Sequence, residues 1–75
     1  MPELRKVSGK ETIKALERLG FKIVRQRGSH VVLKRKIESG EIGCVVPLHQ
    51  EIKIGTLRGI LKLAKVTPEE FLANL

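Results

Sequence analysis

Three short apolar segments follow one another along the chain with only a few residues between them: residues 21–26, 29–35 and 42–46. They are rich in valine and isoleucine, which favour strands, and Arg27-Gly28 separates the first two. A glycine in so short a connection is typical of an antiparallel hairpin. We therefore predict a three-stranded antiparallel meander, with residues 36–41 as a polar loop and Pro47 ending the third strand.

Helical patterns flank these strands. Ser8 and Glu11 form a capping box at the start of the first helix, and Gly20 follows its last apolar residue as a C-cap. Residues 54–64 carry a second apolar helical stripe, and Thr67 with Glu70 starts a short final helix that ends near Leu75. The predicted class is α+β, in the order α-β-β-β-α with a short C-terminal helix, and the helices pack on one face of the sheet.

The size and charge of the chain narrow its function. A chain of 75 residues buries only about 60% of its unfolded surface, so we expect one domain over residues 1–75 and a simple site. The formal net charge is +7, from 15 Lys and Arg against 8 Asp and Glu. This charge favours a nucleic acid or an acidic protein as partner over a basic surface that serves solubility alone.

The lone cysteine, Cys44, excludes an internal disulfide and a cysteine-based zinc site. Its apolar surroundings predict a buried structural thiol, which fits a reducing cytoplasm. No apolar stretch approaches the roughly 18 residues of a membrane span, and the first residues lack the core of a signal peptide. We therefore expect a cytoplasmic protein without a membrane partner. We also expect no metal or other cofactor, because metal-ligand spacings and nucleotide-binding glycine motifs do not occur in the sequence.

His30 is the strongest candidate for chemistry, because histidine is the side chain best suited to proton transfer near neutral pH. It follows Gly28, which lets the backbone bend near a phosphate, and Ser29, whose hydroxyl donates a hydrogen bond. The cations around it are Arg25, Arg27, Lys34 and Arg35. In RNA cleavage, the imidazole would remove the ribose 2′-OH proton or protonate the leaving 5′-oxygen, while the cations bind the phosphate.

The residues alone leave other roles open. His30 also fits an exposed strand position without chemistry, on the face of Val32 and Lys34. His49 either orients its loop through a hydrogen bond or makes a second phosphate contact. Further candidates for RNA contact lie on the basic face of the second predicted helix: Arg58 and Lys62. Because two phenylalanines are the only aromatic residues, we expect RNA contact by charge and shape rather than by stacking.

An ordered set of motifs resembles the HicA, or YcfA-like, family of toxins. The motifs lie at residues 8–11, 19–21, 25–30, 45–49, 54–62 and 67–71. The Gly-Ser-His step alone has low specificity, whereas the ordered set covers most of the chain. The sequence departs from the family pattern at Val31, where an aromatic residue or a second histidine is common, and in a longer loop after residue 35.

The resemblance implies a fold like a double-stranded-RNA-binding domain. It also implies a metal-independent, ribosome-independent endoribonuclease that cleaves messenger RNA and slows translation in a stress response. His30 is then the catalytic residue, with Gly28 and Ser29 as its support. A HicB-like antitoxin would cover the active site, and an acidic face on it would suit the +7 charge. The oligomeric state is left open.

Two further functions fit the same residues. The first is a non-catalytic basic RNA-binding module, in which His30 is one more phosphate contact. The second is a protein-interaction domain whose charge serves only an acidic partner; its RNA binding would be absent or insensitive to salt.

Overall fold

The first helix begins where its capping box predicts. The computed structural model describes residues 3–75, and in it α1 spans Gly9–Arg18 with Ser8 as N-cap. The Glu11 N–H donates to the Ser8 hydroxyl, and the Ser8 N–H donates to the Glu11 carboxylate, both at 3.0 Å. These bonds lower the pKa of Glu11. Gly20, with a φ of 100°, follows the helix in a conformation that suits glycine.

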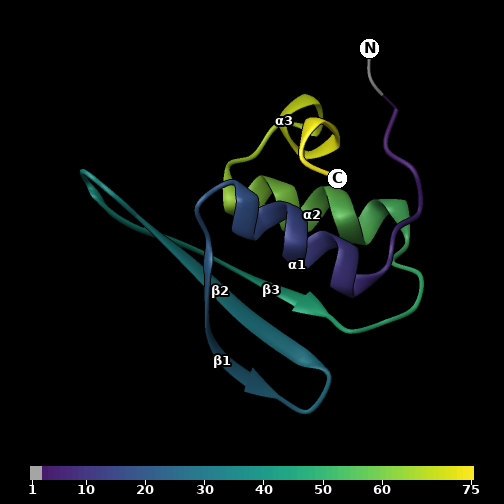
Figure 1. Ribbon diagram of the computed structural model, residues 1–75, viewed down its shortest axis with the longest axis horizontal. Coiled ribbons are helices and arrows are strands. Elements are labelled where there is room, and N and C mark those ends of the chain that lie inside the picture. The colour runs from purple at the N-terminus through teal and green to yellow at the C-terminus, as the bar shows by residue number, and fades with distance from the viewer. Residues whose placement is uncertain (1–2) are drawn as a thin grey trace.

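The predicted meander is confirmed. Strands β1 (Lys22–Arg27), β2 (His30–Ile37) and β3 (Gly40–Pro47) form one antiparallel sheet in the order β1-β2-β3 (Figure 1). A β-bulge between Ile23 and Arg25 leaves Val24 without a partner and shifts the register of β1 by one residue.

The polar loop predicted for residues 36–41 is wrong in length. Lys36 and Ile37 continue β2, and Gly40 already begins β3, so that the turn is confined to residues 38–39. Ladder pairing across the hairpin outweighs the low strand preference of lysine, glutamate and glycine. The resulting β2–β3 hairpin projects beyond the helices (Figure 1).

Two further helices follow the sheet, as predicted. Helix α2 spans Ile54–Ala64 and buries Leu57, Ile60 and Leu61. Helix α3 spans Pro68–Ala73, so it ends slightly before the expected position, and it begins at a capping box of Thr67 and Glu70. None of the helices in residues 3–75 is both long and apolar enough to cross a membrane.

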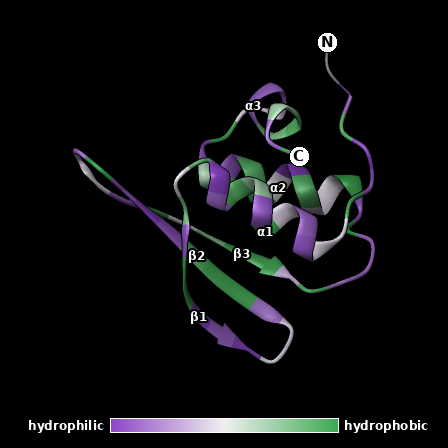
Figure 2. Ribbon diagram, in the orientation of Figure 1, coloured by the Kyte–Doolittle hydropathy of each residue, from purple (hydrophilic) through white to green (hydrophobic). Residues whose placement is uncertain are grey.

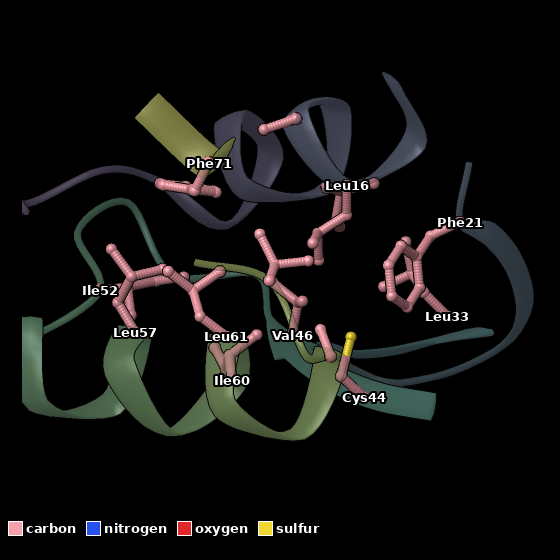
Figure 3. Packing of buried hydrophobic residues seen from close by; sticks show 14 of the residues in the cluster. Leu16, Phe21, Leu33, Cys44, Val46, Ile52, Leu57, Ile60, Leu61 and Phe71 are labelled. Carbon is pink, nitrogen blue, oxygen red and sulfur yellow. The ribbon is translucent and has the colours of Figure 1, made fainter. Parts of the chain in front are cut away.

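The core lies between the helices and one face of β2 and β3. Figure 3 shows side chains from the three helices and the sheet converging there. The largest fully buried side chains include Phe71, Leu16, Leu33, Ile52 and Leu57. Helices on one face of a three-stranded antiparallel sheet confirm the predicted α+β class, which is consistent with a fold like a double-stranded-RNA-binding domain.

The other face of the sheet is open. Residues of β2 and β3 alternate between buried and exposed or half-buried positions, and β1 is exposed along its whole length. Figure 2 shows hydrophilic residues at the end of β1 and at the start of β2, on either side of the turn, and hydrophobic residues toward the end of β3. His30 shares the open face with Val32 and Lys34, as the alternation predicts, because Val31 and Leu33 point into the core.

Candidate functional site

The β1–β2 turn fixes the position of His30, the first residue of β2. Gly28 and Ser29 are its central residues, and Gly28 has a φ of 55°. Within residues 3–75, Lys65 is the one non-glycine residue with positive φ, so Ser29 keeps a negative φ. Positive φ at the first central position alone is type II′ geometry, which favours glycine there. The Gln26 side chain donates to the Gly28 carbonyl at 3.1 Å and holds the turn further.

The same turn is tied to the end of β3, and through it to α1. The Leu48 N–H donates to the Ser29 carbonyl at 2.6 Å, and the Gly9 N–H donates to the His49 carbonyl at 2.8 Å. A Cβ on Gly9 would collide with the Pro47 carbonyl oxygen and lie 2.9 Å from the Leu48 Cα. Glycine is therefore required at the start of α1 for the helix to approach this segment.

His30 is exposed on the open face among cations. It pairs with Arg27 on β1 and with Pro47 on β3. Residues directly opposite each other share a face, with Cβ atoms roughly 4.5–5.5 Å apart. Arg25 and Lys34 lie on the same face, further along β1 and β2. The sheet thus groups one imidazole, two guanidinium groups and one ammonium group.

Carboxylates do not neutralise this group of cations. Among the residues that the structure describes, the single ion pair joins Lys6 and Glu51, at 4.0 Å between exposed side chains. Unpaired cations on an open surface attract anions. Next to His30, such cations are able to hold a phosphate and to stabilise charge that develops on it.

Residues 9–66 match a family model described as the HicA toxin of bacterial toxin–antitoxin. The chain belongs to the HicA toxin family. The match covers all three strands, the His30 turn and α2, and it confirms the resemblance seen in the sequence. A search of curated proteins found no match. Membership makes the chain a toxin of a toxin–antitoxin system, which implies an antitoxin partner.

In this HicA-family chain, Arg35 alternates with Lys34 along β2 and so starts from the face opposite to the other three cations predicted around His30. Its Nη1 donates to the Leu19 carbonyl at 3.0 Å, and its guanidinium carbon lies 5.9 Å from the centre of the Phe21 ring. A cation at the C-terminal end of a helix satisfies a free carbonyl and interacts favourably with the helix dipole. These contacts give Arg35 a structural role in joining β2 to α1.

The two cations predicted on the second helix also lie away from His30 in the HicA-family fold. Arg58 and Lys62 are exposed on α2, and α2 packs against the buried face of the sheet. They therefore belong to the helical layer and not to the open sheet face that carries His30.

His49 follows Pro47 by two residues and so lies at the same end of the sheet as His30. Its backbone carbonyl accepts the hydrogen bond from Gly9, while the residue is exposed. The loop-orienting role that the sequence left open for His49 is therefore carried by its backbone rather than by its imidazole.

Cys44 is a buried free thiol, as the sequence predicts. Desolvation by burial raises the pKa of its thiol from 9.0 to about 11. The reactive thiolate is thus disfavoured near neutral pH, which agrees with a packing role in this HicA-family core.

Sequence reasoning missed two cations of the open face, Lys22 and Lys36. Lys22 lies directly opposite Lys34, and Lys36 follows Lys34 by two residues on β2. Lys36 fell in the predicted loop, and the face of Lys22 depends on the bulge. Extending the second predicted strand to Ile37 would have found Lys36, because strand alternation then places Lys36 on the face of His30.

Proposed function

We propose that this chain is an endoribonuclease that cleaves messenger RNA in the cytoplasm, with His30 as general acid or base. The observation that carries the proposal is an exposed histidine that a glycine turn fixes directly opposite Arg27, on an uncovered sheet face. Membership of the HicA toxin family supports it, because a toxin damages a cellular target and a histidine among cations is able to act on RNA.

The chemistry is a transfer within the RNA chain. The ribose 2′-oxygen attacks the adjacent phosphorus, the bond from phosphorus to the 5′-oxygen breaks, and a 2′,3′-cyclic phosphate and a 5′-hydroxyl result. His30 either takes the proton from the 2′-hydroxyl or gives one to the leaving 5′-oxygen. Arg27 and Arg25 bind the phosphate and stabilise its extra charge in the transition state.

The second proton transfer has three candidate sources: water, His49 or a neighbouring cation. The residues opposite His30 are Arg27 and Pro47, and proline has no group to transfer a proton. His49 is exposed and follows Pro47, the residue opposite His30, by two positions, so it lies at the same end of the sheet.

We further propose that the antitoxin is HicB-like and binds over the open sheet face. Support comes from the unpaired cations there, which suit an acidic surface, and from the absence of a covering helix on that face within residues 3–75. Such a partner would bury His30 and exclude RNA.

The decisive experiment compares His30→Ala with wild type, and His49→Ala tests separately whether His49 makes the second proton transfer. We expect His30→Ala to lose RNA cleavage by about 10²-fold or more, and to lose growth arrest, because general acid–base catalysis contributes that much. Its stability should change by less than about 0.5 kcal/mol, since the residue is exposed. Cleavage of purified messenger RNA, growth and urea denaturation are the measurements.

Cleavage by His30→Ala at the wild-type rate would remove His30 from the mechanism. The alternative function is a non-catalytic RNA-binding module, which is favoured by the lack of a second histidine or a carboxyl group directly opposite His30. That module predicts bound RNA without cleavage products for wild type and His30→Ala alike.

A further inference from the structure

A notch opens at the end of β2 far from His30. Strand β1 begins at Lys22, opposite Lys34, so that Arg35 and Lys36 have β3 on one side and no strand on the other. The notch encloses about 330 Å³. Figure 1 shows the start of β1 and the projecting β2–β3 hairpin, the two elements that contribute to its lining. The side chains that line it include Lys22, Val24, Lys34, Arg35, Lys36 and Glu41. Its volume falls at the lower end of the range of small-molecule sites, roughly 300–1,000 Å³.

The lysines of this notch repel one another. Lys22 and Lys34 are directly opposite on adjacent strands, where like charges destabilise a sheet. Glu41 lies opposite Lys36, but the one ion pair within residues 3–75 joins Lys6 and Glu51 instead. The folded chain thus keeps a local repulsion that an anion in the notch would relieve.

A cationic track connects the notch to His30 along the open face. Arg27 and His30 form its first pair, Arg25 follows, and Lys22 with Lys34 forms the pair at the notch. His30 and Lys34 are four residues apart on β2, about 13 Å at about 3.3 Å per residue. One phosphate cannot touch both ends of this track, whereas successive phosphates of one strand can.

We propose that the notch binds a backbone phosphate of the RNA strand, a few nucleotides from the phosphate that His30 cleaves. This inference rests on the proposed function, because it takes RNA as the ligand. Lys22, Lys34 and Lys36 bind the phosphate, and Val24, which is 54% exposed, offers an apolar wall to the neighbouring sugar or base. A groove that follows the backbone with cations is the usual way to hold a single strand.

The test compares two double variants of equal net charge, both in a His30→Ala background so that RNA stays intact. One is Lys22→Gln with Lys36→Gln, in the notch. The control is Lys10→Gln with Lys14→Gln, at exposed positions of α1, the helix that packs on the other face of the sheet. Affinity for a single-stranded RNA that reaches from His30 to the notch is measured over a series of salt concentrations.

We expect the notch variant to bind RNA more weakly, with the slope of log affinity against log salt reduced by about 0.7, the value for one lost phosphate contact on a single strand. The α1 variant should keep the slope of its His30→Ala parent. Glu41→Gln should bind more tightly, because it removes the carboxylate of the notch. The notch variant should be at least as stable as its parent in urea, because the Lys22–Lys34 repulsion is gone.

Equal losses in the two double variants would overturn the inference, since net charge alone would then explain them. It would also be overturned if the notch variant kept its RNA affinity and lost only its affinity for an acidic protein partner. Wild-type cleavage tests the proposed function separately. RNA that is bound through the notch but never cut would refute the endoribonuclease and leave the notch site standing.

Discussion

Single residues in this chain divide clearly between those that support the fold and those that are free to react. His30 is exposed, and its position depends on the positive φ of Gly28 and on the hydrogen bond that Ser29 accepts from Leu48. Arg35 shows the reverse case, because its guanidinium already contacts Leu19 and Phe21. The residue type alone does not distinguish a cation for RNA from one for the core.

Cys44 gives the prediction at this scale. Its pKa is about 11 in the folded chain against an ordinary 9.0, so its contribution to stability is present below pH 9 and is lost as the pH rises toward 11. We expect the free energy of unfolding of wild type, relative to Cys44→Ala, to fall over that interval. Urea denaturation at several pH values measures the difference, and a constant difference would contradict the assignment.

Among the elements, helices α1 and α2 differ in whether the packing requires their glycines. Gly9 lies at the start of α1 and has no room for a side chain beside Pro47 and Leu48. Gly55 and Gly59 lie on the exposed side of α2, and a Cβ at either would meet nothing within 4 Å. The packing within this chain therefore requires the glycine of α1 and not those of α2.

A pair of alanine substitutions tests this contrast. We expect Gly9→Ala to lower the free energy of unfolding by about 1–3 kcal/mol, because the added methyl group forces α1 away from the segment after β3. Gly59→Ala should raise it by about 1 kcal/mol through helix propensity. Urea denaturation gives both values. A Gly9→Ala variant as stable as wild type would show that the contact with Pro47 is not tight.

For the whole molecule, charge is the dominant feature. The chain has a net charge of +7, and the ion pair within residues 3–75 is a weak one between exposed side chains. The folded state therefore concentrates positive charge that the unfolded chain spreads out. The same charge that favours an RNA or antitoxin partner opposes folding.

Salt should accordingly stabilise the free toxin. We expect the midpoint of thermal unfolding to rise as sodium chloride increases from low to physiological concentration, because screening weakens the repulsion. The Lys10→Gln, Lys14→Gln variant, with two fewer charges, should gain less. A midpoint that falls with added salt would mean that attractive pairs outweigh the repulsion.

Much of the fold and part of the candidate site could be predicted from the sequence because they depend on local interactions. Ser8 with Glu11 and Thr67 with Glu70 mark helix starts through bonds that span only three residues. Gly28 marks the hairpin, and strand alternation then puts His30 on the exposed face. The role of His30 itself came from the resemblance and stays a proposal.

Only the tertiary structure decided how the strands align beyond that turn. Arg27 pairs with His30. If this register continued along β1 without the bulge, Lys22 would lie opposite Arg35, on the face of the sheet that the helices cover. The bulge at Val24 moves Lys22 opposite Lys34 instead and so creates the cationic notch. The sequence determined the helix starts, the hairpin and the exposed His30. The register and the length of β2 depend on residues that meet only after folding, because pairing across a sheet outweighs local preference. The contacts of Arg35 likewise join residues that lie far apart in the sequence.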